Sequence, residues 1–125
     1  MMKELLTKDI KQFILQHPSS ILIDVRSKDE WENIGKPDGD KINLETHFLS
    51  IKNIKGEINK NFTEEFKNLK IDKEKEILVM CKAGSRSFLV SNLLEKEDYN
   101  CINISDGFEG NDPNNGWKNS GLPIC

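Results

Sequence analysis

The sequence predicts an α/β fold built on a parallel sheet of four or five strands with helices on both faces. Short apolar segments of strand length alternate along the chain with segments whose apolar residues recur at helical spacing. The apolar segments are continuous instead of alternating with polar residues, as in parallel strands buried on both faces. The expected strands are residues 21–25, 41–44, 77–80 and 101–104. With 125 residues, the chain has the length of one domain, residues 1–125.

Three expected helices precede the central strand at residues 77–80. Thr7 is placed to cap the first, which carries apolar residues at positions 10, 13 and 14. Ser27 and Glu30 have the spacing of a capping box, which predicts a short second helix ending at residues 35–37. Thr63 is placed to cap a third helix, ending near residue 70. The residues expected to face inward from the last two helices are Trp31, Ile34, Phe62, Phe66 and Leu69.

Composition narrows the classes of partner and the cellular location. The chain has 18 Lys and Arg against 21 Asp and Glu, a formal net charge of -3, and its basic residues are scattered. This distribution gives no electrostatic footprint for nucleic acid. Since no apolar run approaches the roughly 18 residues of a membrane span, and charges interrupt the first ten residues, we expect a cytoplasmic protein with no membrane partner.

The three cysteines form no pattern typical of a structural disulfide or a metal site. Their number is odd, and no Cys-x-x-Cys pair is present. Cys101 begins an apolar strand, and we expect it to be buried. Cys125 ends the chain, where a disordered thiol is the expectation, with a resolving role for Cys125 left open. No metal or organic cofactor is predicted.

The most informative segment is the one that runs from residue 77 to residue 87. Its apolar strand ends on Cys81, a small-residue loop leads to Arg86, and helical periodicity follows over residues 88–94. Backbone N–H groups of such a loop, with the positive end of the following helix, form a site for negative charge. Residues 24–26 and 106–107 also lie at the carboxyl ends of expected strands, so we expect them to share this rim of the sheet.

Cys81 is accordingly a candidate nucleophile. A free cysteine has a pKa near 8.5, and helix N-termini or nearby cations lower it to roughly 3.5–7.5. Lys82 and Arg86 supply two cations, and an arginine can hold an oxyanion with two parallel hydrogen bonds. A Cys and His dyad is not predicted, because His17 and His47 lie in segments expected to be surface or packing positions.

In this segment the sequence resembles the rhodanese family of sulfurtransferases. The active-site loop of that family runs from a cysteine through four residues to an arginine, as from Cys81 to Arg86, whereas cysteine phosphatases have five intervening residues. Residues 22–26, 105–110, 116–118 and 121–123 also resemble family segments. The resemblance implies that Cys81 attacks a sulfane sulfur. It also implies an anion site formed by Lys82, Ala83, Gly84, Ser85 and Arg86, supported by Asp24, Arg26 and Ser87.

Two segments depart from the family pattern. Residues 35–41 lack the histidine of the Gly-His-Ile-Pro-Gly-Ala segment, and residues 45–60 match no family pattern. Both segments are expected to contribute to the pocket walls. The departures therefore leave the sulfur donor and acceptor unnamed without affecting the nucleophile.

The expected function is transfer of a sulfane sulfur from thiosulfate, or a similar small anionic donor, through a persulfide on Cys81. The acceptor is cyanide, a thiol or a protein, and the covalent intermediate makes this a double displacement. One alternative is a cysteine phosphatase or arsenate reductase in the same cradle, with Asp24 or Asp106 as general acid. The other is a non-catalytic rhodanese-like interaction module.

Overall fold

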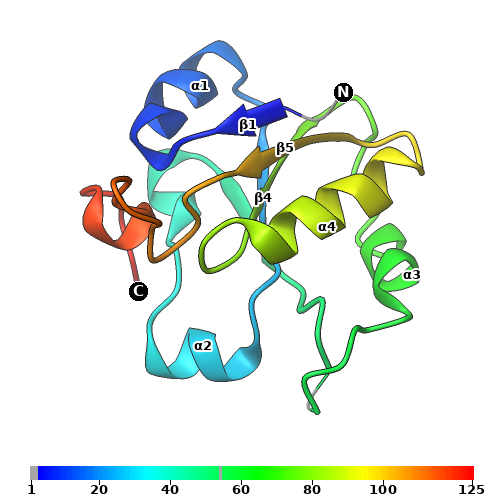
Figure 1. Ribbon diagram of the computed structural model, residues 1–125. Helices are drawn as coiled ribbons and strands as arrows, with labels where there is room; N and C mark the ends of the chain where they lie inside the picture. The colour runs from blue at the N-terminus through cyan, green and yellow to red at the C-terminus, as the bar shows by residue number, and fades with distance from the viewer. Residues whose placement is uncertain (1–2, 54) are drawn as a thin grey trace.

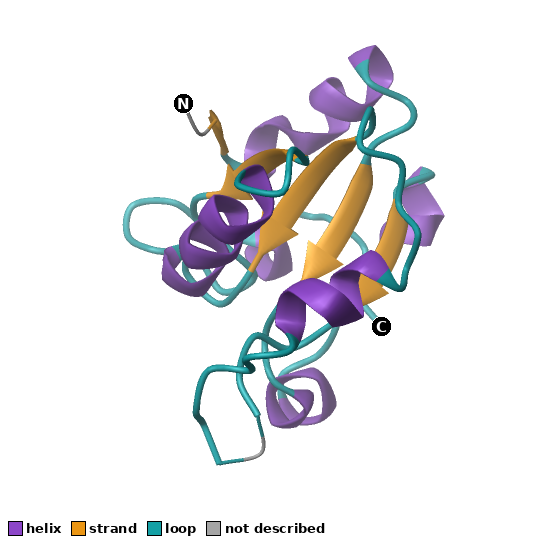
Figure 2. Ribbon diagram, turned by 90° about the vertical axis from the view of Figure 1, so that its right-hand side faces the viewer, coloured by secondary structure: helices purple, strands orange, loops and turns teal. Residues whose placement is uncertain are grey.

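The strands form a single parallel sheet, as the sequence predicts. In this computed structural model, which describes residues 3–53 and 55–125, the sheet has five strands in the order β1-β5-β4-β2-β3. Figure 2 shows the strands side by side and pointing the same way. The strands are β1 (Lys3–Leu5), β2 (Ile21–Asp24), β3 (Glu45–Phe48), β4 (Glu76–Met80) and β5 (Asn100–Ile104).

The central strand is β4, which places its end in the middle of the sheet rim. Ile77 of β4 is in register with Ile21 of β2 on one side and with Cys101 of β5 on the other. The carboxyl ends of β2, β4 and β5 therefore meet at one edge, the place where parallel α/β sheets bind ligands.

Each face of the sheet packs against its own apolar layer, because alternate residues of a strand point to opposite faces. Ile77 and Val79 of β4 join the cluster containing Phe62, Phe66, Val90 and Leu94. Leu78 and Met80 join the cluster containing Ile10, Phe108 and Trp117. Burial on both faces explains why β2 and β4 are apolar without alternation.

Helices cover both faces of the sheet, as predicted (Figure 1). The helix α1 (Ile10–Gln16), preceded by the 3₁₀ turn η1 (Thr7–Asp9), lies on one face with the C-terminal 3₁₀ turn η3 (Trp117–Asn119). On the other face lie α3 (Phe62–Lys67) and α4 (Ser85–Glu95). The short helix α2 (Lys28–Asn33) lies beyond the carboxyl ends of the strands. It carries the predicted capping box between Ser27 and Glu30.

The strand predicted at residues 41–44 is wrong. The 3₁₀ turn η2 (Gly39–Ile42) occupies the first half of that segment, and the Leu44 N–H donates to the Gly39 carbonyl at 2.9 Å. The strand is β3, which lies four residues later and pairs with β2 through the register Leu22↔Thr46. Only pairing with β2 distinguishes this polar edge strand from a loop.

Two predicted caps are also wrong. The Thr7 hydroxyl donates to Asp106 Oδ2 at 2.6 Å and makes no cap, since α1 begins later. Thr63 lies inside α3, whose N-cap is Asn61. Trp31 and Ile34 do not reach the core, because Trp31 is half-buried and Ile34 is 38 % exposed.

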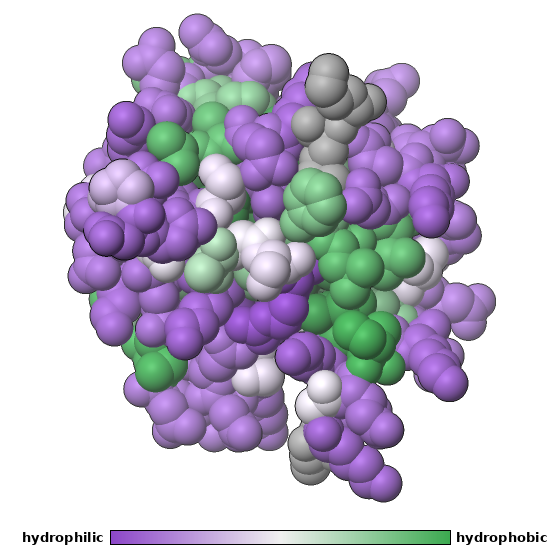
Figure 3. All heavy atoms as spheres, viewed as in Figure 1, coloured by the Kyte–Doolittle hydropathy of each residue, from purple (hydrophilic) through white to green (hydrophobic). Residues whose placement is uncertain are grey.

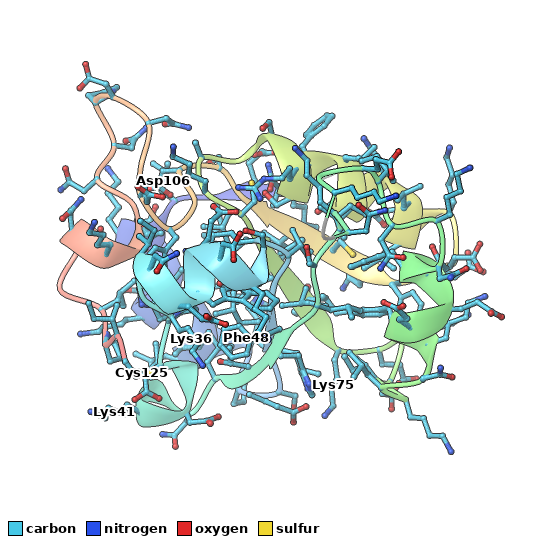
Figure 4. All side chains as sticks on the ribbon, turned by 90° about the horizontal axis from the view of Figure 1, so that it is seen from below. Lys36, Lys41, Phe48, Lys75, Asp106 and Cys125 are labelled. Atoms are coloured by element: carbon cyan, nitrogen blue, oxygen red, sulfur yellow. The ribbon has the colours of Figure 1, made fainter. Side chains whose placement is uncertain are left out.

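The C-terminus is tied to the body of the protein, so the disorder predicted at Cys125 is wrong. The backbone N–H and carbonyl groups of Cys125 and Lys36 exchange two hydrogen bonds, of 2.9 and 3.1 Å. Figure 4 shows Cys125 beside Lys36, whose Nζ lies 5.5 Å from the centre of the Phe48 ring. The Cys125 side chain is exposed, whereas Cys101 is buried as predicted.

The surface in the view of Figure 3 is mostly polar, with apolar side chains gathered over α4 and α3. The exposed ones in this region include Phe88, Leu89 and Leu69. Across residues 3–53 and 55–125, no helix has both the length and the apolar character needed to cross a bilayer.

Candidate active site

Cys81 follows directly on β4 and lies at the centre of the sheet rim. Its side chain is 1 % exposed, and its Sγ atom accepts a hydrogen bond from the Gly84 N–H at 3.1 Å. The helix α4 begins at Ser85, directly after Gly84, so its positive N-terminal end also faces the sulfur. The loop thus directs the Gly84 N–H at Sγ, and the anion cradle formed by residues 82–86 stays a prediction.

The segment after β5, residues 105–110, supports the loop of Cys81 through backbone hydrogen bonds. Phe108 N–H donates to the Cys81 carbonyl at 2.8 Å, and Glu109 N–H donates to the Lys82 carbonyl at 3.0 Å. Gly84 and Gly107 make this close approach possible, because a Cβ on either would lie 2.4 Å from a carbonyl oxygen of the opposite segment. Both also have positive φ, of 108° and 62°. The resemblance of residues 105–110 to the family thus corresponds to a direct support for Cys81.

Ser87 lies below the cradle, one turn into α4. It is fully buried, and its Oγ is 3.3 Å from Cys81 Sγ and 3.2 Å from the Gly84 carbonyl. Ala83 is half-buried and Ser85 is exposed. Of the residues expected to support Cys81, Ser87 is the one in contact with its sulfur.

Arg86 is bound by a residue that the sequence analysis assigned only to a cap. Its Nη1 and Nη2 donate to Glu30 Oε1 and Oε2 at 2.7 and 2.9 Å, a bidentate pair that joins α4 to α2. Arg86 therefore brings positive charge to the site, but both terminal nitrogens of its guanidinium are engaged by Glu30.

Acid is expected to break this pair. Burial raises the pKa of Glu30, but hydrogen bonds from Arg86 and Ser27 outweigh burial and lower the pKa from 4.5 to about 2. Because the folded value lies below the unfolded one, the stabilisation is complete above pH 4.5 and is lost as the pH falls towards 2. Because solvent screens this partly exposed pair, we expect its contribution to be about 1 to 2 kcal/mol.

The measurement is urea unfolding of the wild type and of Glu30→Gln between neutral pH and pH 3. Glutamine keeps an oxygen for the cap hydrogen bonds with Ser27, and it removes the charge together with the acceptor for Arg86 Nη2. We expect the wild type to be more stable at neutral pH and the difference to shrink on acidification. Parallel pH profiles for the two proteins would show that the pair contributes nothing.

Asp24 and Arg26 form a buried ion pair that belongs to the frame of the site. Both side chains are fully buried, and Arg26 Nε and Nη2 donate to the Asp24 carboxylate at 2.9–3.1 Å. Nη2 also donates to the Gly35 carbonyl at 2.8 Å, and the guanidinium lies 4.0 Å from the centre of the Phe108 ring. The pair thus links the end of β2 to the residues after α2 and to the segment that supports Cys81.

A cleft of about 1150 Å³ opens beside Lys82 and Arg86. Its apolar wall includes Trp31 and Phe48, whose rings meet edge to face at 5.4 Å, together with Ile34. Lys82 is exposed at the rim of this cleft. The wall comes from α2 and from the segment after residue 45 that matches no family pattern.

Sequence reasoning missed two asparagines that contact the cradle. Asn111 Nδ2 donates to the carbonyls of Ala83 and Ser105, both at 2.8 Å, and so links the two loops. Asn103 accepts a hydrogen bond from Ser87 at 2.5 Å. A buried amide in the apolar strand 101–104 was the available signal for Asn103, since buried polar groups need partners. Asn111 carried no signal, because its loop composition predicts only a turn.

Comparison with known proteins agrees with this geometry. The family model for the rhodanese-like domain matches residues 6–111. An uncharacterized protein of Rickettsia prowazekii is 40% identical over 119 residues, which cover 94% of this chain and 91% of the relative. A second, from Rickettsia conorii, is 38% identical over 112 residues, covering 88% and 86%.

Two solved structures resemble the fold closely. A crystal structure from M. tuberculosis superimposes with a TM-score of 0.84 at 25% identity, covering 98% of this chain and 96% of the other. The polysulfide-sulfur transferase homodimer of Wolinella succinogenes gives a TM-score of 0.72 at 25% identity, covering 99% and 78%. Since the family model spans β2 to β5, the Cys81 loop and the segment that supports it, the chain belongs to the rhodanese-like domain family.

Proposed function

We propose that this protein is a sulfurtransferase that carries a sulfane sulfur as a persulfide on Cys81. The observation that supports this most directly is the position of Sγ, which accepts the Gly84 N–H at the start of α4 in a four-residue cradle. A polysulfide-sulfur transferase among the structural neighbours supports the same class of reaction.

The reaction proceeds in two displacements. The Cys81 thiolate attacks the outer sulfur of thiosulfate, the S–S bond of the donor breaks, and sulfite leaves with the bonding pair. Cys81 then carries a terminal persulfide anion. Attack on the outer sulfur of the persulfide by cyanide or by a thiolate transfers that sulfur and regenerates the thiolate. Each step conserves charge and needs neither metal nor oxidant.

The donor is a small anion bound at the mouth of the cradle. Lys82, exposed beside the nucleophile, supplies the direct cationic contact, and the Gly84 N–H adds a backbone donor at Cys81 Sγ. Arg86 contributes positive charge without binding the donor directly, because its terminal nitrogens are hydrogen-bonded to Glu30. The acceptor is a thiol or a protein, for which the cleft of about 1150 Å³ is much larger than thiosulfate requires. A reducing cytoplasm suits these free thiols.

A phosphatase reaction is the weaker candidate because it needs a general acid beside the leaving group. Asp24 is fully buried and bound by Arg26. Asp106 is 2 % exposed and accepts from the Thr7 N–H and hydroxyl and from the Gly116 N–H. Neither carboxyl faces the cleft, so the two acids that this reaction would use are both occupied.

The test is mass spectrometry of the intact protein after incubation with thiosulfate, followed by cyanide. We expect the mass of one sulfur atom to be gained and then lost as thiocyanate. Hydrolysis of a phenyl phosphate without sulfur uptake would replace this proposal by the phosphatase. No reaction with thiosulfate, a polysulfide or the phosphate ester would favour the non-catalytic interaction module.

A further inference from the structure

A chain of hydrogen bonds connects Cys81 to the edge strand β1 through two buried residues. Ser87 Oγ lies 3.3 Å from Cys81 Sγ and donates to Asn103 Oδ1 at 2.5 Å. Asn103 Nδ2 donates to Glu4 Oε1 at 3.0 Å. Ser87 is fully buried and Asn103 is 3 % exposed, so neither exchanges these partners for solvent. The chain places a surface carboxylate three side chains away from the nucleophile.

The direction of each hydrogen bond follows from what the partners can do. Besides Glu4, Asn103 Nδ2 donates to the Gly84 carbonyl at 3.2 Å. A carboxylate and a carbonyl only accept, so the NH₂ group of the amide must face them and Oδ1 must face Ser87. Ser87 has a single hydroxyl proton, and Asn103 Oδ1 takes it at 2.5 Å, whereas the Gly84 carbonyl already accepts from Asn103 Nδ2 and from the Phe88 N–H. Ser87 therefore presents a lone pair to Cys81 Sγ.

We infer that Asn103, oriented by Glu4, is a positioning residue that keeps the Ser87 proton away from Cys81 and favours the thiol over the thiolate. A thiol donates its proton to the Ser87 lone pair, whereas a thiolate is repelled by it. If Ser87 turned to donate to a thiolate, Asn103 Oδ1 would remain buried without a donor. The Gly84 N–H acts in the opposite direction, since it favours the thiolate.

The chain through Ser87 thus favours the thiol form of Cys81, and the Gly84 N–H favours the thiolate form. A protonated cysteine resists oxidation, because the thiolate is the species that oxidants attack. The inference rests on the proposed function only in taking Cys81 as the reacting thiol. The register of the sheet produces the arrangement, since Glu4 of β1 pairs with Asn103 of β5.

Other charged groups around Cys81 are shared by every variant compared below. They come from the cradle, α4, α2, the end of β2 and the segment after β5. Glu30 and Arg86 neutralise each other, as do Asp24 and Arg26, and Asp106 is bound by Thr7 and Gly116. Lys82 and Glu109 line the cleft together. Their effect on the ionisation of Cys81 is therefore the same in each variant, and only the hydrogen-bond chain differs.

The test is a pH titration of the Cys81 thiolate by its ultraviolet absorbance, in a Cys125→Ser background with the Cys81→Ser spectrum subtracted. Cys101 does not interfere, because burial raises its pKa to about 12. For Ser87→Ala and Asn103→Ala we expect the midpoint to move to lower pH by about half to one unit, which is about three- to ten-fold more thiolate below the midpoint. Midpoints that stay or rise in both variants overturn the inference, because Ser87 would then be a donor to the thiolate.

Glu4→Gln provides a variant at an exposed position, where folding is not at risk. A glutamine amide accepts or donates, so it frees Asn103 to turn, and we expect a smaller shift in the same direction. If Glu4 acts through Asn103, Glu4→Gln shifts nothing in the Asn103→Ala background. An equal shift in both backgrounds would show a direct charge effect and overturn the role of Glu4.

The titration is independent of sulfur uptake. Failure of the thiosulfate experiment with the expected midpoints leaves this inference standing and removes the proposed function. Normal sulfur uptake with unchanged midpoints supports the proposed function and overturns this inference.

Discussion

Replacing Cys81 with serine is expected to abolish sulfur uptake from thiosulfate, lowering the rate by about a thousand-fold or more. A serine hydroxyl fits the same space and can still accept the Gly84 N–H, so the cradle remains. It is not ionised at neutral pH, and an oxygen at this position cannot become a persulfide. The loss therefore reports on chemistry and not on folding.

Two measurements establish this prediction. The first is the mass gained by each variant after incubation with thiosulfate, and the second is the initial rate of thiocyanate formation. Cys125→Ser is the matched control, because this exposed thiol is the other one that reagents reach and it lies beside Lys36 at the C-terminus. We expect the control to retain full activity. A persulfide that persists in Cys81→Ser and disappears in Cys125→Ser would transfer the nucleophilic role to Cys125.

The core of the fold could be predicted because its strands carry their own signal. The continuous apolar runs of β2 and β4 require burial on both faces, and a parallel sheet covered by two layers provides it. The capping box at Ser27 and Glu30 is likewise local, and the structure confirms it. Such features depend on neighbours in the sequence, so the sequence reveals them.

The two edge strands could not be predicted in the same way. β1 has three residues, two of them charged, and it is a strand only because it pairs with β5 almost a hundred residues later. β3 has the sequence Glu-Thr-His-Phe, contains no fully buried residue, and takes its register from β2. Edge strands are short and polar because they meet solvent, so hydrophobic pattern cannot identify them.

In the candidate site, too, the features formed by neighbouring residues could be predicted, whereas those formed by distant residues could not. The position of Cys81 and its cradle follow from a continuous segment, residues 77–87. The side chains that hydrogen-bond to that segment lie elsewhere in the chain. Glu30 binds Arg86, Asn111 binds the Ala83 carbonyl, and Asn103 binds Ser87. The expectation that Arg86 directly holds the donor was made without Glu30, and a bidentate partner 56 residues away has no local signal.

Replacing Arg26 with leucine is expected to destabilise the protein by about 3–5 kcal/mol at neutral pH. Arg26 is fully buried, and the change leaves the Asp24 carboxylate without its cation in the interior. It also removes the donor to the Gly35 carbonyl and the contact with Phe108. Breaking one half of a buried ion pair costs more than the pair contributes, because the remaining charge is neither solvated nor paired.

The control variants separate the charge from the lost packing. In Asp24→Asn with Arg26→Leu no charge is left behind, so we expect it to recover part of the stability, measured by urea unfolding. Burial raises the pKa of Asp24 and the bonds from Arg26 lower it, so losing Arg26 raises it further. A carboxyl whose folded pKa lies above the unfolded value stabilises the protein below the unfolded pKa and loses that contribution as the pH rises. The loss of unfolding free energy in Arg26→Leu should therefore shrink on acidification. A loss that is constant with pH in the single variant, and equal in the double variant, would contradict this. It would trace the destabilisation to packing around Phe108 and Gly35 alone.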